Sequence, residues 1–131
     1  MEQALSHVAA DPIKVQCAGR TDTGVHALGQ VIHFDTQVER SLRSWLLGAN
    51  SNLPESIAIQ RVQPMSEDFH ARFSARARSY RYVISNQVSR PALLVGKATW
   101  CVKPLDVERM QQAANSLLGK HDFTSFRALA C

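Results

Sequence analysis

Seven consecutive residues near the start of the chain bring a cation, a carboxylate and an imidazole together. They begin at Arg20 and end at His26, with Asp22 as the carboxylate, inside the stretch AGRTDTGVHALG. The stretch joins two predicted strands, at 14–17 and 30–34, and loops held on strands often carry catalytic groups. An aspartate before a glycine-containing turn is also a common turn former. Spacing alone therefore leaves Asp22 as a turn residue in the loop that is richest in reactive groups.

A metal site would need more ligands than this loop offers. Asp22 and His26 could supply two, but His33 lies beyond the loop on a predicted strand, and no cysteine or further histidine clusters nearby. The pattern favours histidines with ordinary hydrogen bonds. We therefore expect no metal.

A second stretch interleaves arginines with aromatic rings. Residues 69–82, hereafter the arginine-rich segment, have the sequence FHARFSARARSYRY, and the region 69–105 holds seven cations and no acidic residue. Guanidinium groups bind phosphates and rings stack on unpaired bases, so RNA is one ligand that suits this pattern. A charged edge strand, with Tyr80 and Tyr82 packed in the core, is the alternative. Charge alone does not separate the two.

The bulk composition is that of a globular protein. Of 131 residues, 45% are hydrophobic and 20% are charged. No apolar run approaches the roughly 18 residues needed to cross a membrane, and the first residues lack a signal-peptide layout. Cys17, Cys101 and Cys131 have no CxxC spacing, which indicates reduced thiols. These features together predict a cytoplasmic protein.

Helical and strand patterns alternate along the chain, which predicts an α+β fold with sheets covered by helices on one face. Apolar spacing predicts helices at 2–9, 42–49 and 105–118. The last helix pattern is preceded by Pro104 and followed by Gly119. Strands are predicted at 14–17, 30–34, 57–62, 77–84 and 98–102.

Three ordered motifs resemble those of the A-type tRNA pseudouridine synthases. CAGRTDTGVHALGQVIHF, at 17–34, resembles a signature written around G-R-T-D-x-G-V-H-A. DFHARFSARARSYRYVI, at 68–84, resembles a second family motif, and GKHDFTSFRA, at 119–128, a third. NSNLP, at 50–54, also fits. The resemblance covers essentially the whole chain.

The resemblance implies an isomerase that detaches uracil from its ribose and rejoins it through C5 in place of N1. It implies that Asp22 is the catalytic carboxylate, that Arg20 helps to extrude the uridine, and that Tyr80 packs against the target base. The other substrate-binding residues that it implies are Thr21, Gly24, His26, Arg72, Arg76 and Arg78. Because the reaction involves no redox change, neither a metal nor an organic cofactor is implied.

The same resemblance implies a fold and partners. The fold would consist of partial RNP-like (ferredoxin-like) subdomains with a mixed or antiparallel sheet. Residues 1–67 would belong to the first subdomain, with the catalytic loop at 18–29, and 68–131 would begin the second. We expect the family's opening strand and most of its second half, which supplies a basic partner for the catalytic aspartate, to be missing here.

The partner implied is the anticodon stem-loop of tRNA, with no membrane, and the chain is expected to form a homodimer or to self-associate as a fragment. A non-catalytic RNA-binding fragment of such an enzyme is the alternative function. A purely structural or oligomerising domain would leave the basic region unexplained.

Overall fold

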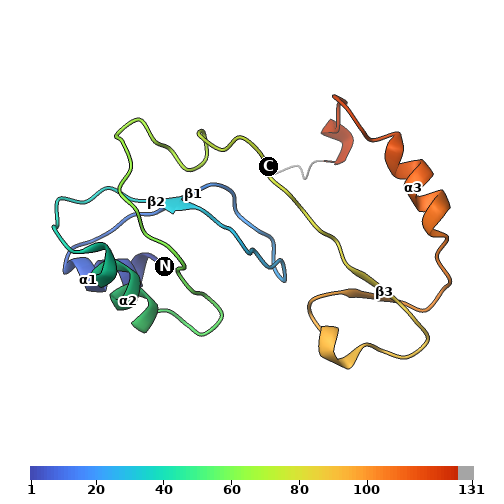
Figure 1. Ribbon diagram of the computed structural model, residues 1–131, viewed down its shortest axis with the longest axis horizontal. Coiled ribbons are helices and arrows are strands. Elements are labelled where there is room, and N and C mark those ends of the chain that lie inside the picture. The colour runs from blue at the N-terminus through green and yellow to red at the C-terminus, as the bar shows by residue number, and fades with distance from the viewer. Residues whose placement is uncertain (127–131) are drawn as a thin grey trace. The chain divides into compact units, whose positions relative to one another are not determined.

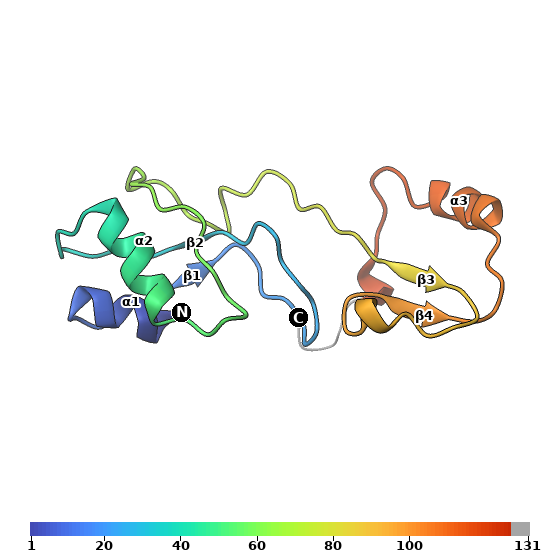
Figure 2. The same cartoon turned by 60° about the horizontal axis from the view of Figure 1, so that its bottom comes forward.

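The computed structural model describes residues 1–126. The chain forms two compact units, one from Met1 to Tyr80 and one from Arg81 onward (Figures 1 and 2). The arginine-rich segment therefore lies in the first unit as far as Tyr80. The subdomain limits at 67 and 68 remain a prediction about the family fold. Cys131 and the last two residues of the third motif, 127 and 128, lie outside the described residues.

In the first unit, two helices pack together beside a two-stranded antiparallel sheet (Figure 1). The elements in chain order are α1 (Glu2–Ala9), β1 (Gln16–Cys17), β2 (Ile32–His33) and α2 (Leu42–Ser51). The predicted helices are confirmed, and the first two predicted strands are confirmed in shortened form. Ser41 caps α2 by accepting a hydrogen bond from the Ser44 N–H at 3.0 Å, which satisfies one of the free amides of the first turn.

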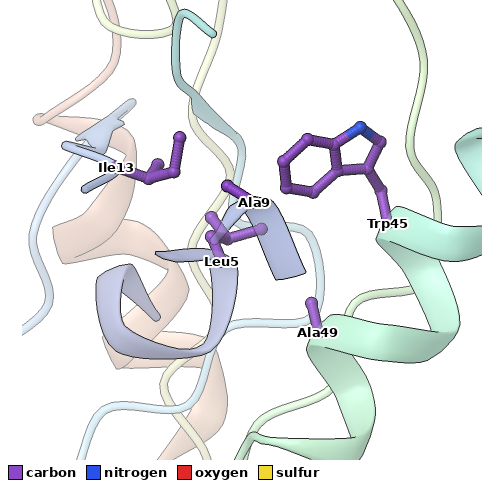
Figure 3. Packing of buried hydrophobic residues seen from close by; sticks show 5 residues of the cluster. All are labelled: Leu5, Ala9, Ile13, Trp45 and Ala49. Carbon is purple, nitrogen blue, oxygen red and sulfur yellow. The ribbon is translucent and has the colours of Figure 1, made fainter. Parts of the chain in front are cut away.

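The core of this unit lies between the two helices and the chain that enters the sheet. It consists of Leu5, Ala9, Ile13, Trp45 and Ala49 (Figure 3). The Phe34 ring extends the core from the end of β2, with its centroid 5.1 Å from that of Trp45. Burying side chains as large as Leu5 stabilises the fold by about 1.5–3 kcal/mol each. The β1–β2 pair is thus anchored to the hydrophobic core of this unit.

Gly48 lets α1 and α2 approach closely. A Cβ at position 48 would lie 2.9 Å from Cγ2 of Val8, and a valine side chain cannot swing away easily. We predict that Gly48→Ala lowers the free energy of unfolding by about 1–2 kcal/mol, because overpacking outweighs the gain in helix propensity. Urea unfolding followed by circular dichroism measures the change.

Val8→Ala supplies the control for this prediction, because it removes both methyl groups that the new Cβ would meet. In the Val8→Ala background, Gly48→Ala should be neutral or stabilising. An equal loss of stability in both backgrounds would show that the close approach of the helices is not the cause.

The predicted strand at 57–62 is wrong. The Ile59 N–H donates to Oδ1 of Asn50 at 2.7 Å, and the Ile59 carbonyl accepts from Nδ2 of the same side chain at 2.9 Å. One amide at the end of α2 thus supplies the two bonds that a neighbouring strand would have made to Ile59. No strand is assigned at 57–62.

As far as residue 126, the second unit has a small parallel sheet and one regular helix. Its elements are β3 (Ile84–Asn86), the 3-10 turn η1 (Ala92–Leu94), β4 (Thr99–Cys101), α3 (Val107–Asn115) and the 3-10 turn η2 (Thr124–Phe126). β3 pairs with β4 in parallel, with Ile84 opposite Thr99. The predicted strand at 98–102 is confirmed as β4. The one at 77–84 is wrong except at its last residue, because the ladder with β4 begins only at Ile84.

Asn86 connects the sheet of this unit to the chain that enters α3. Its Nδ2 donates to the carbonyls of Cys101 and Lys103, both at 2.8 Å, and its Oδ1 accepts from the Leu105 N–H at 3.1 Å. The helix predicted at 105–118 is confirmed over a shorter range. Asp106 is its N-cap and accepts from the Arg109 N–H.

The third motif includes a small capped turn. The hydroxyl and the backbone N–H of Thr124 both donate to Oδ1 of Asp122. These two bonds, first of all the one from the hydroxyl, hold the pKa of the Asp122 carboxyl below its usual value. Asp122 thereby caps η2.

The α+β class is confirmed, and residues 1–126 form three helices and small antiparallel and parallel sheets. Among residues 1–126, no helix has the length and apolar character that a membrane crossing requires.

Candidate active site

The loop between β1 and β2 carries the residues that the sequence singled out first. It extends well beyond the two short strands (Figure 2), and its base is held by backbone and side-chain bonds. The Ala18 N–H donates to the Val31 carbonyl at 2.9 Å, which adds one rung beyond the β1–β2 ladder. Nε2 of Gln30 donates to the Gly19 carbonyl. The loop therefore begins from a fixed backbone.

Asp22 lies in a turn at the exposed part of this loop. The Val25 N–H donates to the Asp22 carbonyl at 3.1 Å, and Gly24 has φ of 83°, a conformation that favours glycine. The turn is closed by the backbone of residue 22, a bond that any residue type could accept. The carboxylate does not close the turn. The turn therefore does not require an aspartate at position 22.

Arg78 joins the arginine-rich segment to the base of the loop. Its Nη2 donates to the Ala18 carbonyl at 2.7 Å across 60 positions of sequence. Its Nε lies 3.5 Å from the place that a Cβ on Gly19 would occupy. The two stretches of sequence with the richest chemistry therefore meet within one compact unit.

Tyr80 follows Arg78 by two residues in the same segment. Two residues of extended chain span at most about 7 Å, so the contact of Arg78 with Ala18 limits how far the backbone of Tyr80 can lie from the base of the loop. The Tyr80 ring is 82% exposed. An exposed aromatic ring is available to stack on a base, and Tyr80 does not pack in the core.

The profile of one protein family matches this unit. A family model described as tRNA pseudouridine synthase matches residues 1–74, more than half of the chain, including the loop and the start of the arginine-rich segment. The chain belongs to the tRNA pseudouridine synthase family. It is 57% identical to tRNA pseudouridine synthase A of Pseudomonas aeruginosa, 56% to that of Vibrio cholerae and 58% to that of Klebsiella pneumoniae, over all 131 residues.

The match covers 46%, 50% and 48% of those three proteins, respectively. The chain thus spans about half the length of the curated relatives that it matches.

Within this family member, a histidine holds the start of the arginine-rich segment on the sheet. Nε2 of His70 lies 2.6 Å from Oε1 of Gln16 on β1, and Nδ1 of His70 accepts from the N–H groups of Arg72 and Phe73. The Ser74 hydroxyl in turn accepts from the His70 N–H at 3.1 Å. Because Nδ1 is an acceptor, Nε2 carries the proton and donates to Gln16.

His33 makes the second contact between the sheet and this segment. Its Nδ1 accepts from the Ala71 N–H at 3.1 Å, and its ring centroid lies 4.7 Å from that of His70. The interpretation of His33 as a strand histidine with ordinary hydrogen bonds is therefore confirmed. The role of His70 was not predicted from the sequence, because histidine is not among the residues that usually form such local bonds to the backbone.

The arginines of the segment differ in their surroundings. Cζ of Arg72 lies 5.9 Å from the centroid of the exposed Phe73 ring, while Arg76 is an exposed side chain. Arg78 alone among the three donates to a loop carbonyl within the described residues. Arg20, Thr21, Gly24 and His26 all lie in the exposed loop. Within residues 1–126, no three His, Cys, Asp or Glu side chains are grouped to hold a metal ion.

Proposed function

We propose that this chain carries the catalytic loop of an enzyme that isomerises uridine to pseudouridine in the anticodon stem-loop of tRNA. The observation that carries the proposal is the bond between Arg78 and Ala18, which joins the two principal family motifs in one unit. Relatives that are 57% and 56% identical to this chain are named tRNA pseudouridine synthase A. The fold of the complete enzyme would contain the RNP-like subdomains that the family implies.

The reaction exchanges one bond for another without a change in oxidation state. The bond between C1′ of the ribose and N1 of uracil breaks, the base turns, and a bond forms between C1′ and C5. The proton on C5 leaves to solvent, and N1 takes up a proton. Asp22 supplies the carboxylate for attack or proton transfer, and the exposed turn that carries it is open to a nucleotide.

Access to the glycosidic bond requires the uridine to leave its stack. Unstacking costs a few kcal/mol, which the enzyme must offset with new contacts. In our proposal Arg20 enters the space that the base leaves, and the exposed Tyr80 ring packs against the extruded base. Thr21, Gly24 and His26 shape the loop around it. The chemistry needs no metal or organic cofactor.

Arg72 and Arg76 bind the RNA backbone in this proposal. Each phosphate contact releases counterions and steepens the dependence of affinity on salt. Changing both residues to Ala should make the slope of log K against log salt shallower by about 1–2. Arg43→Ala with Arg61→Ala, which removes equal charge from exposed positions elsewhere in the first unit, should leave the slope nearly unchanged. Equal slopes for the two double variants would assign Arg72 and Arg76 a structural role.

We infer that the enzyme acts in the cytoplasm on tRNA and works as a homodimer. The alternative function is a non-catalytic RNA-binding fragment. It is opposed by the presence of the loop with its aspartate, arginine and turn glycine.

A hybrid enzyme tests the proposed function. Residues 1–131 replace the matching part of the Pseudomonas aeruginosa relative, and the hybrid is incubated with unmodified tRNA that carries tritium at C5 of uridine. The proposal predicts steady release of tritium to water as the C5 proton leaves. Tight binding of tRNA by the folded hybrid without tritium release would favour the non-catalytic alternative.

A further inference from the structure

The carbonyl groups at the base of the 18–29 loop need donors from outside the sheet. The β1–β2 ladder ends with Cys17 opposite Ile32, and the Ala18 N–H adds one backbone bond beyond it, to the Val31 carbonyl. Beyond that rung, the Ala18 carbonyl accepts from Arg78 and the Gly19 carbonyl from Gln30. For these two residues, side-chain donors thus replace the backbone donors of the ladder. Of the two side chains, Arg78 comes from outside the hairpin.

Arg78 is suited to this role by its chemistry. A charged donor makes a stronger hydrogen bond to a carbonyl than a neutral one, and the planar guanidinium presents several N–H groups in a fixed arrangement. Its Nε lies 3.5 Å from the position that a Cβ on Gly19 would occupy, so the guanidinium lies next to residue 19 at van der Waals distance. The side chain therefore donates to the Ala18 carbonyl and lies beside Gly19, whereas a phosphate-binding arginine needs its donors free.

The position of Arg78 in the chain connects two parts of the proposed site. Asp22 lies four residues after the carbonyl that Arg78 binds, and Tyr80 lies two residues after Arg78 itself. A shift of the loop base would move the carboxylate relative to the segment that carries the ring. Misplacement of a catalytic group by about 1 Å can cost about a hundredfold in rate.

We propose that Arg78 is a positioning residue, which fixes the loop of Asp22 against the segment of Tyr80, and does not act mainly as a phosphate ligand. This inference rests on the proposed function for its kinetic consequence, since it assigns Asp22 the chemical step. Its structural part, that Arg78 holds the loop base, is independent of any activity.

Hydrogen exchange tests the structural part on the 131-residue chain. In Arg78→Gln, the backbone amides of the loop, above all those of Ala18 and Val25, should exchange about tenfold faster, while the amides of α2 exchange as before. Arg76→Gln removes the same charge two residues away and should leave loop exchange unchanged. Equal exchange of the loop amides in Arg78→Gln and in the unaltered chain would overturn the proposal.

Kinetics on the hybrid enzyme test the functional part. Arg78→Gln should lower kcat by about ten- to a hundredfold with KM for tRNA within about twofold, because binding is intact and the carboxylate is misplaced. Arg76→Gln should instead raise KM. Arg78→Lys keeps the charge and replaces Arg78→Gln in this test if the glutamine variant fails to fold. For either Arg78 variant, a raised KM at unchanged kcat would overturn the proposal.

If the unaltered hybrid releases no tritium, the proposed function fails, whereas the exchange measurement still decides whether Arg78 holds the loop.

Discussion

Asp22→Asn is expected to abolish tritium release by the hybrid enzyme, with a loss of kcat on the order of 10³-fold or more. An amide has nearly the shape of the carboxylate but is neither a comparable nucleophile nor a base. The turn should survive the change, because its closing bond runs from the Val25 N–H to the backbone carbonyl of residue 22. Affinity for tRNA, measured by filter binding, should change by less than about twofold.

Thr23→Ala is the matched control for this substitution. Thr23 is the neighbour of Asp22 in the same turn and occupies the variable position of the family signature. Its replacement should leave kcat close to that of the unaltered hybrid. Substantial residual turnover in Asp22→Asn would place the reactive carboxylate elsewhere in the chain.

The 131-residue chain by itself is expected to self-associate. All of the buried apolar side chains among residues 1–126 belong to the first unit. In the second unit, Val107 is 75% exposed, Leu118 72% and Phe126 84%. Apolar patches beyond a few hundred Å² rarely stay bare on a monomer. Sedimentation velocity at micromolar concentration should therefore show dimers or larger species.

One substitution on α3 tests the source of this association. Met110, which is 45% exposed, lies on the apolar side of α3 with Val107. Met110→Lys should shift the sedimentation profile toward monomer, whereas Gln112→Lys, which adds the same charge on the opposite side of the helix, should not. A monodisperse monomer from the unaltered chain would contradict this account of the apolar surface.

The sequence was sufficient to predict the elements whose local signals agree with their burial in the core. The helix at 2–9 and the one around Trp45 follow from apolar spacing, and Ser41 supplies the N-cap of the latter. The position of Asp22 in a loop between two paired strands also follows from the flanking strand patterns and the glycines between them.

The remainder depends on contacts between residues that are distant in sequence. Residues 57–62 have the composition of a strand, but the Asn50 amide takes the backbone groups of Ile59. Residues 77–83 alternate as a strand would, yet the ladder with β4 starts only at Ile84, and Tyr80 remains exposed. No local sequence pattern predicts that Arg78 binds a carbonyl 60 positions away. Because Arg78 lies in a segment rich in arginines, its sequence context suggests a phosphate ligand instead.

The most direct test of the central claim is to locate the product. Unmodified tRNA is treated with the hybrid enzyme and digested, and its anticodon stem-loop fragment is analysed for pseudouridine by liquid chromatography and mass spectrometry. The account predicts conversion of uridine to pseudouridine in that fragment, with none when Asp22 is changed to Asn. Bound tRNA whose uridines all remain unchanged would contradict it.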